Sequence, residues 1–319
     1  MITTYIIIGV AAIVLIKVYH KLSTGMCKSV EKMENKVVII TGSNTGIGFQ
    51  TALDLAKRGA KVILACRDEK RGTTARDKII QSTGNKQVIY KHLDLASFES
   101  VREFAEDILK TEKQLDVLIN NAGLGDVYNS VTGDNVPLVA QVNHFSPFLL
   151  TVTLLPLLKA SAPSRIINVS STLHTSGTID LDKFHKHAPS YVKSATIAGV
   201  RNYSNTKLAN ILFTRKLSSM LHGTGVTANS LHPGAVNTEI FRDGGIVIRF
   251  LVGFFFITAF EGAQTSIHLA VSKDVENVSG KYFANCRETK PAAKAEDDEM
   301  AEKLWKLSES VVSFDKKNE

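Results

Sequence analysis

A glycine-rich turn between an apolar run and a helical pattern constrains the fold more than any other feature of this chain. Residues 37–40 (Val-Val-Ile-Ile) are typical of a buried strand, and Leu53, Leu55 and Ala56 follow with helical spacing. Between them stands Thr41-Gly42-Ser43-Asn44-Thr45-Gly46-Ile47-Gly48. The three glycines let the backbone turn tightly and approach a pyrophosphate, while the helix N-terminus offers unpaired N–H donors to that charge. The alternative is a tight strand-to-helix turn that binds no ligand.

A second apolar strand, residues 61–65, ends where a dinucleotide-binding fold distinguishes a ribose hydroxyl from a phosphate. Cys66 stands where a hydroxyl-binding carboxylate is expected, and the adjacent Arg67 supplies a planar cation suited to a 2′-phosphate. The sequence therefore predicts NADP(H) as the cofactor. Asp68 leaves NAD as the alternative, because a shift of one or two residues in the strand end would bring its carboxylate to the ribose.

One tyrosine stands out by the residue that follows it. Of the seven tyrosines, only Tyr203 has a lysine four residues later, Lys207, and helical spacing puts both side chains on one face. A phenol has an ordinary pKa of about 10, so it exchanges protons poorly near neutrality. We expect the neighbouring ammonium to lower that pKa and make Tyr203 an acid–base group. Taken alone, the Tyr-x-x-x-Lys pattern is too common to prove this role.

With the glycine turn, this pair makes the chain resemble the short-chain dehydrogenase/reductase family over residues 36–290. Further motifs of that family are Leu93-Asp94-Leu95, Asn120-Asn121-Ala122-Gly123, Asn143 in Val-Asn-His-Phe, Asn168-Val169-Ser170-Ser171, and Pro233-Gly234 with Thr238 downstream. The resemblance implies an α/β fold, a doubly wound parallel sheet (Rossmann-type) in a single domain. It also implies a cofactor site made of Gly42, Ser43, Asn44, Thr45, Gly46, Ile47, Gly48, Arg67, Asp94, Leu95, Asn121, Ala122, Gly123, Tyr203, Lys207, Pro233, Gly234, Val236 and Thr238.

By the same resemblance, the catalytic residues are Asn143, Ser171, Tyr203 and Lys207. In carbonyl reduction Tyr203 would give a proton to the substrate oxygen and Ser171 would bond that oxygen. Lys207 would lower the tyrosine pKa and bind the nicotinamide ribose. Asn143 would anchor a water of the proton relay, or it is a structural helix residue. Ser171 is preferred to Ser170 because the second serine of this motif normally faces the substrate.

Two further cofactor contacts also follow from the resemblance. Asp94 would contact the adenine amine, although an aspartate at this place could also act as the N-cap of the next helix. Thr238 would hold the nicotinamide carboxamide, and residues 121–123 would line the cofactor groove.

The closer resemblance is to the membrane-associated retinol dehydrogenase/retinal reductase branch. It is carried by residues 40–48, 65–68, 203–214, 261–265, 279–283 and 303–305. The branch implies an oxidoreductase that interconverts a lipophilic alcohol and its aldehyde or ketone, with retinol and retinal as the leading pair. The alternatives are a steroid or other lipid carbonyl reductase, and a non-catalytic, membrane-tethered scaffold that only binds cofactor.

Residues 172–202, between Ser171 and Tyr203, depart from the branch in length and content. This insertion carries His174, His185 and His187, and His-x-His spacing can ligate zinc. No cysteine or aspartate constellation accompanies the histidines, so we expect no metal site. We expect instead a solvated lid segment beside the substrate mouth.

The N-terminus is apolar, and we expect residues 1–21 to anchor the chain in a membrane. Lysines follow the apolar run rather than precede it, which places the catalytic domain on the cytosolic side of the endoplasmic reticulum or another lipid surface. A hydrophobic tail lying along the enzyme's own surface is the alternative. The net charge of +7 comes without a nucleic-acid motif, so membrane lipid is the expected partner and nucleic acid is not.

Two C-terminal segments keep alternative roles. The apolar run at residues 246–260, with Phe254-Phe255-Phe256, would line a lipophilic cavity, touch the membrane or form a plain core helix. Residues 291–319 are expected to form a helical extension through Ala301, Leu304, Trp305 and Leu307, which either packs on the domain or binds a partner. Three widely separated cysteines argue against a disulfide framework, and the oligomeric state is left open.

Overall fold

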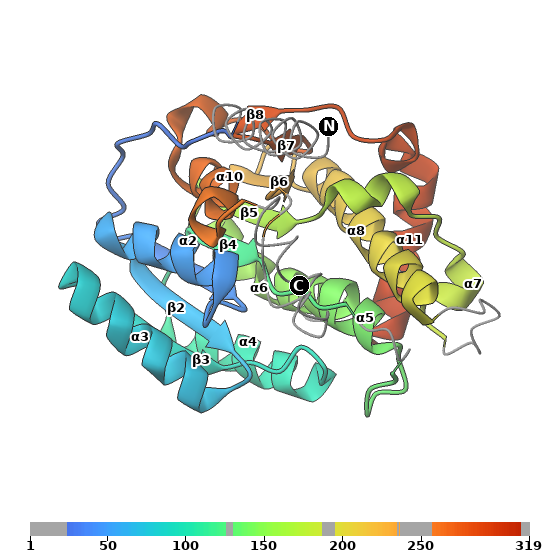
Figure 1. Ribbon diagram of the computed structural model, residues 1–319, viewed down its shortest axis with the longest axis horizontal. Coiled ribbons are helices and arrows are strands. Elements are labelled where there is room, and N and C mark those ends of the chain that lie inside the picture. Colours follow the sequence, from blue (N-terminus) through green and yellow to red (C-terminus); the bar gives the residue numbers. More distant parts are fainter. Residues whose placement is uncertain (1–23, 126–129, 187–194, 235, 237–256, 314–319) are drawn as a thin grey trace, which may run out of the picture.

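The computed structural model describes residues 24–125, 130–186, 195–234, 236 and 257–313 (Figure 1). The expected anchor at residues 1–21, His187, Thr238 and residues 246–256 of the second apolar run lie outside these described residues. Within the described part, helices cover both faces of one central sheet.

The sheet contains eight strands in the order β3-β2-β1-β4-β5-β6-β7-β8. All neighbouring pairs are parallel except β7 and β8. The chain runs outward from β1 to β3 and then returns to place β4 on the other side of β1. The strands are β1 (Val37–Thr41), β2 (Lys61–Cys66), β3 (Val88–His92), β4 (Val117–Asn120), β5 (Ser164–Val169), β6 (Val226–His232), β7 (Tyr282–Ala284) and β8 (Arg287–Glu288).

Two hydrophobic cores, one on each face, hold the layers together. The side chains of α2 (Gly46–Lys57), α3 (Glu69–Thr83) and α10 (Ala259–Val271) share one core with Val38 and Ile40 of β1. Those of α4 (Phe98–Thr111), α6 (Ser146–Ala160) and α8 (Ala195–Met220) share the other core with Ile39. Consecutive β1 residues thus point to opposite faces, and both faces are buried, as expected for a strand of a covered parallel sheet. The predicted doubly wound, Rossmann-type fold is confirmed.

The remaining described elements are six short ones and the C-terminal helix α11 (Asp298–Val311). The short ones are α5 (Leu138–Ala140), the π-helical turn η1 (Gln141–Phe145), η2 (Thr172–Ser176), α7 (Leu181–Phe184), η4 (Lys273–Val275) and η5 (Ala293–Glu296). The continuous helical run at residues 138–160 is the one described segment long and apolar enough to cross a membrane. Most of that run is buried in the protein, so it is a core helix.

The C-terminal helix α11 packs against α8. Trp305 is buried, and its ring lies 5.8 Å from that of Phe213 and 4.8 Å from that of Phe148. Leu304 and Ala301 are buried in the same core. The sequence left packing and partner binding as alternatives for this helix, and the structure shows that it packs on the domain.

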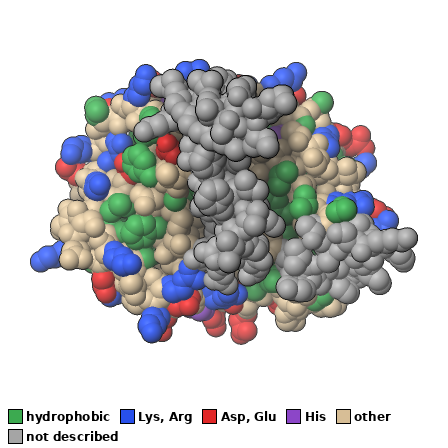
Figure 2. All heavy atoms as spheres, in the orientation of Figure 1, with side chains coloured by type: hydrophobic (Ala, Val, Ile, Leu, Met, Phe, Trp, Pro, Cys, Tyr) green, Lys and Arg blue, Asp and Glu red, His purple; other side chains and the backbone are tan. Residues whose placement is uncertain are grey.

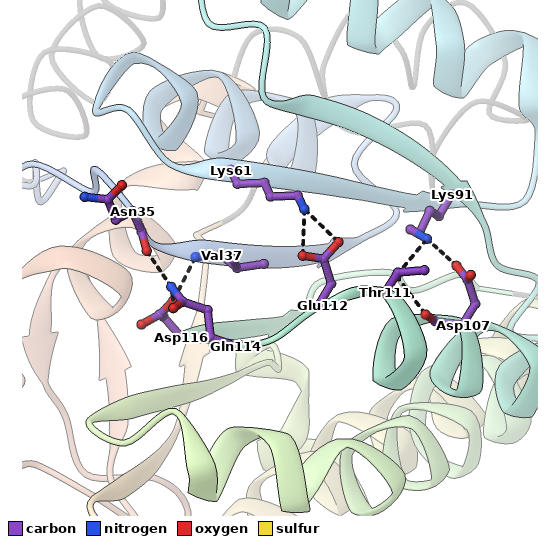
Figure 3. A network of polar contacts seen from close by, with 9 residues as sticks. All are labelled: Asn35, Val37, Lys61, Lys91, Asp107, Thr111, Glu112, Gln114 and Asp116. Atoms are coloured by element: carbon purple, nitrogen blue, oxygen red, sulfur yellow. Dashed lines mark hydrogen bonds and ion pairs between the residues drawn. The ribbon is translucent and has the colours of Figure 1, made fainter.

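Charged residues tie the amino ends of the strands together (Figure 3). Asp116 accepts a hydrogen bond from the backbone N–H of Val37 at 2.8 Å and forms an ion pair with Lys36 at 2.8 Å. Lys61 binds Glu112 at 2.6 Å. This edge lies opposite the carboxyl ends of the strands, where ligands of such sheets bind. Elsewhere on the face shown in Figure 2, Lys and Arg side chains are intermixed with Asp and Glu.

Candidate active site

The glycine turn lies at the carboxyl end of β1, where the strand order reverses between β1 and β4. Gly42 has φ +65°, and a Cβ there would meet the Cα of Ala122 at 2.9 Å. A Cβ on Gly48 would lie 2.5 Å from the Asn121 side chain and 2.6 Å from the Gly42 carbonyl oxygen. Only glycine fits at these two positions, because the β1–α2 turn and the chain after β4 approach so closely.

Gly46 differs from the other two glycines because it faces open space. Its φ is +57°, and a Cβ there would meet no described atom within 4 Å. It is the first residue of α2, whose N-cap Thr45 makes no side-chain capping bond. Free N–H donors of a helix N-terminus beside an open backbone form a cradle for a pyrophosphate. These residues therefore fit a dinucleotide.

The residues after β2 are those that bear on the choice between NADP and NAD. The thiol of Cys66 is buried 3.5 Å from the Ser43 hydroxyl, and burial raises the pKa of that thiol. The Asp68 carboxylate accepts a hydrogen bond from the Arg71 N–H at 2.9 Å and caps α3. Arg67 is exposed at the strand end. The carboxylate that favoured NAD is thus engaged in capping, while the guanidinium faces solvent.

Asp94 does not cap the following helix, so that alternative is wrong. Ser97 is the N-cap of α4, and its hydroxyl accepts from the Ser100 N–H at 3.2 Å. Asp94 instead accepts from the N–H of Ala96 at 2.9 Å in the turn before that cap. The neighbouring Leu95 is buried, and its carbonyl accepts from the Ser146 hydroxyl at 2.6 Å.

The segment after β4 is held by Thr41, which was not predicted as a site residue. The Thr41 hydroxyl oxygen accepts from the N–H groups of Asn121 and Ala122, both at 3.0 Å. The Asn121 amide donates to the Thr41 carbonyl at 2.8 Å. A Cβ on Gly123 would lie 3.2 Å from Lys207 Nζ. This segment therefore bridges the glycine turn and α8. The sequence could have indicated a role for Thr41, because it is a polar residue that ends an otherwise apolar strand.

Tyr203 and Lys207 lie together on α8, with Ser171 across from them at the end of β5. Lys207 Nζ is 5.3 Å from the centre of the Tyr203 ring. The Ser171 side chain lies close enough to the Tyr203 phenol to lower its pKa. Ser170 points elsewhere, because its hydroxyl donates to the Lys207 carbonyl at 2.7 Å. The structure thus brings three of the four proposed catalytic residues together and gives Ser170 a structural contact.

Asn143, the fourth, lies in the π-helical turn η1 and is fully buried. Its amide N–H donates to the Leu124 carbonyl at 2.9 Å and to the Thr206 hydroxyl at 3.1 Å. Its oxygen accepts from the Leu124 N–H at 2.9 Å and lies near Gly123. Single π-helical turns within helices are frequent at functional sites. Asn143 therefore braces the wall of the site beside Lys207. Thr206, which holds the Asn143 amide, is the second residue of the site, after Thr41, that was not predicted from the sequence.

The pKa values of the pair differ from the expectation. Burial raises the pKa of Tyr203 to about 12, and the Ser171 side chain offsets only part of this effect. Burial lowers the pKa of Lys207 to about 8. Lys207 Nζ donates to the Val169 carbonyl at 3.0 Å rather than to the phenol. The charge of an ammonium would by itself lower the tyrosine pKa, but the loss of water around both groups dominates here.

The remaining predicted cofactor contacts follow β6. Gly234 has φ +94°, and a Cβ there would lie 2.4 Å from the Ile257 side chain. Val236 is buried and forms an isolated parallel bridge with Ile257. Pro233 precedes them in the same loop. These residues lead the chain toward α10.

Most residues of the insertion between 172 and 186 are exposed, as expected for a solvated segment, but three buried side chains attach it to the domain. His174, Ile179 and Phe184 are buried. His185 bonds the Leu181 carbonyl at 3.1 Å. Among the described residues, no group of three or more His, Cys, Asp or Glu side chains is arranged to hold a metal ion.

Known proteins resemble this chain over most of its length. The short chain dehydrogenase family model matches residues 36–181. Retinol dehydrogenase 13 of Mus musculus is 45% identical over 309 residues, covering 94% of this chain and 90% of that relative. Retinol dehydrogenase 12 of Homo sapiens is 44% identical over 289 residues, covering 89% and 88%. A solved structure of an uncharacterized Mycobacterium Paratuberculosis protein has a TM-score of 0.71 at 31% identity, covering 91% and 98%. Similarity this close over nearly the whole of both chains means that the chain belongs to the short-chain dehydrogenase/reductase family, as an oxidoreductase of its retinol dehydrogenase branch.

Proposed function

We propose that the chain is an NADP(H)-dependent oxidoreductase that interconverts a lipophilic alcohol and its carbonyl compound, with retinol and retinal as the leading pair. The observation that carries the proposal is that the Ser171 side chain and the Tyr203 phenol lie together beside buried Lys207. The relatives named retinol dehydrogenase support the choice of substrate.

Each residue of the site has a separate role in the proposed reaction. A bound nicotinamide supplies or accepts the hydride. Tyr203 donates a proton to the substrate oxygen in reduction, and Ser171 bonds that oxygen. The raised pKa of Tyr203 keeps its phenol protonated at neutral pH, and the pKa of Lys207, about 8, leaves most of that amine charged. In this protonation state Tyr203 is ready to donate its proton in carbonyl reduction, whereas the net direction depends on the ratio of reduced to oxidised cofactor. Asn143 braces the wall that Lys207 faces.

The cofactor preference rests on the end of β2. Arg67 is exposed there, and Asp68 is committed to capping α3. We expect Arg67→Ala to weaken NADPH binding at least tenfold and to leave NADH binding unchanged. Arg76→Ala on the exposed side of α3 is the matched control, because Arg76 pairs only locally with Asp77. Equal affinities of the Arg67 variant and the control for NADPH would overturn the preference.

The substrate is tested with membranes carrying the full chain. Wild type is assayed with NADPH and retinal, then with ketosteroids and a wider carbonyl panel. Turnover of retinal above the steroids supports the proposal, and the reverse order favours the steroid alternative. No turnover with any carbonyl, despite NADPH binding, would leave the non-catalytic scaffold.

The membrane attachment is a separate proposal that rests on the apolar N-terminus. We expect deletion of residues 1–21 to release the protein from vesicles of endoplasmic reticulum composition. In the full chain on these membranes, we expect protease added on the cytosolic side to reach the catalytic domain. A truncated protein that still sediments with these vesicles would show that attachment lies elsewhere in the chain.

A further inference from the structure

His174, inside the insertion, makes two backbone contacts that link the site to the C-terminal part of the chain. Its Nδ1 lies 2.7 Å from the carbonyl oxygen of Ser171. Its Nε2 lies 3.1 Å from the backbone nitrogen of Ala292, which is 118 residues away. The side chain is only 3% exposed, so water does not compete for these contacts.

The polarity of the two partners fixes the tautomer of His174. A backbone N–H can only donate, so Nε2 must accept from Ala292. A carbonyl oxygen can only accept, so Nδ1 must carry the proton that it donates to Ser171. The imidazole is therefore neutral, with its hydrogen on Nδ1.

We propose that His174 is a positioning residue for Ser171, which it clamps to the Ala292 segment through the neutral Nδ1–H tautomer. This inference rests on the proposed function, because it gives Ser171 a role in turnover. The clamp acts on the residue whose side chain lies beside the Tyr203 phenol and lowers its pKa. It works with a second tie, in which Lys294 of η5 donates to the Gly177 carbonyl at 2.5 Å. Both ends of η2 are thus attached to the segment that leads into α11.

Several elements surround His174 with groups that bear on its protonation. The Tyr282 ring of β7 contacts it edge-on at 5.0 Å between ring centres. His232 of β6 accepts from the Thr172 N–H at 3.3 Å, and Lys294 adds a positive charge from η5. On α8, Tyr203 lies beside Ser171.

Protonation of His174 breaks the clamp. An added proton on Nε2 would point at the Ala292 N–H, where two donors repel each other. Burial lowers the pKa of His174 below its ordinary value of 6.5, and the charge of Lys294 lowers it further. The clamp is intact at neutral pH and is lost as the pH falls below that range. The pKa of His232 is lowered to about 4, so its titration lies further into the acid range.

The clamp can also be cut from the side of the C-terminal segment. The φ of Ala292 is −61°, which proline adopts, so Ala292→Pro removes the N–H donor and puts the ring Cδ in place of its hydrogen, which excludes His174 Nε2 from the contact. Ala293→Pro is the matched control, because Ala293 is exposed at the first position of η5, where proline is tolerated. A hydrogen bond of ordinary net strength corresponds to roughly a two- to tenfold effect. We expect kcat with NADPH and retinal to fall about three- to tenfold in Ala292→Pro alone, with KM for NADPH unchanged.

Two substitutions of the histidine separate its nitrogens. The amide of His174→Asn can replace the Nδ1 donor, whereas the oxygen of His174→Gln can replace the Nε2 acceptor. For wild type, loss of the clamp predicts that kcat falls at acid pH. We expect His174→Asn to keep more of kcat than His174→Gln, and both variants to lack this acid fall. Wild-type kcat and an unchanged acid limb in both variants, with Ala292→Pro equal to Ala293→Pro, would overturn the proposal.

A spectroscopic readout keeps this test independent of turnover. The ¹⁵N shifts of the His174 ring in the full-length protein in detergent, assigned with His174→Asn, should report a proton on Nδ1. A proton on Nε2 at neutral pH would overturn the clamp. If wild type reduces no carbonyl of the panel, the proposed function fails, and a role of His174 in turnover fails with it. The ring shifts would still decide whether His174 makes the two contacts.

Discussion

Gly46→Ala should separate the stability of the glycine turn from its ability to bind cofactor. In the left-handed region, a residue with a Cβ costs roughly 1–2 kcal/mol. Gly46 has φ +57°, and a methyl group there would meet no atom of the described residues within 4 Å, so that backbone cost is the loss expected in the free protein. At roughly 2–4 °C per kcal/mol for a domain of this size, Tm should fall by a few degrees.

Gly84→Ala is the matched control for that backbone cost. Gly84 ends α3 with φ +72°, and a Cβ there would also lie more than 4 Å from every atom in the part of the chain that the structure describes. Both variants should lose the same stability. Only the Gly46 methyl would stand in the pyrophosphate cradle, so only Gly46→Ala should weaken NADPH binding, by at least tenfold or about 1.4 kcal/mol.

The assay is thermal unfolding at increasing NADPH concentration. A ligand that binds only the native state stabilises it by about 2.7 kcal/mol at 100 times Kd. This stabilisation should appear in wild type and Gly84→Ala and be shifted to higher NADPH concentrations in Gly46→Ala. Equal NADPH dependence in the two variants would refute the assignment of the cradle.

Three further predictions concern stability and its pH dependence. Lys207→Met should abolish turnover yet stabilise the protein by about 1–3 kcal/mol at pH 7, because at a pH below its lowered pKa of about 8 the wild-type amine is charged while buried. In denaturant titrations this gain should shrink as the pH rises from 8 toward 10, where the amine loses its proton in the folded protein. Asp116→Ala should cost roughly 2–3 kcal/mol in urea unfolding by leaving the Val37 N–H unpaired, with kcat unchanged at the opposite edge of the sheet; a change in kcat alone would contradict this. Trp305→Ala should cost about 3–5 kcal/mol, whereas a loss below 1 kcal/mol would show that α11 is not part of the core.

The features that the sequence predicted are those encoded by neighbouring residues. The strand, glycine turn and helix at residues 37–57 follow from apolar runs and turn chemistry over a few positions. The fold class, the family and the enzyme class rested on such local motifs, and they are confirmed. The pairing of Tyr203 with Lys207 is a helical i, i+4 relation, so the structure places them as that spacing requires.

The features that the sequence could not supply depend on distant contacts or on the loss of water. The bond between His174 and Ala292 spans 118 residues, and no periodicity marks it. The shift of the Tyr203 pKa arises from burial by the whole domain, which a local pattern does not report. Capping of α4 was an alternative role for Asp94, but the cap lies three residues later at Ser97, because the side chains of both residues suit a cap. The amphipathic pattern of α11 predicted a buried face without naming α8 as its partner.

The proton-donor role of Tyr203 is tested most directly by single-turnover oxidation of NADPH with excess enzyme and retinal. Tyr203→Phe is compared with Tyr282→Phe, which removes a buried hydroxyl that has no hydrogen-bond partner among the described residues and keeps its ring. The account predicts that Tyr203→Phe binds NADPH normally but oxidises it at least a hundredfold more slowly, within the range of general acid catalysis. It also predicts a wild-type rate for Tyr282→Phe. Equal rates for Tyr203→Phe and wild type would contradict the account.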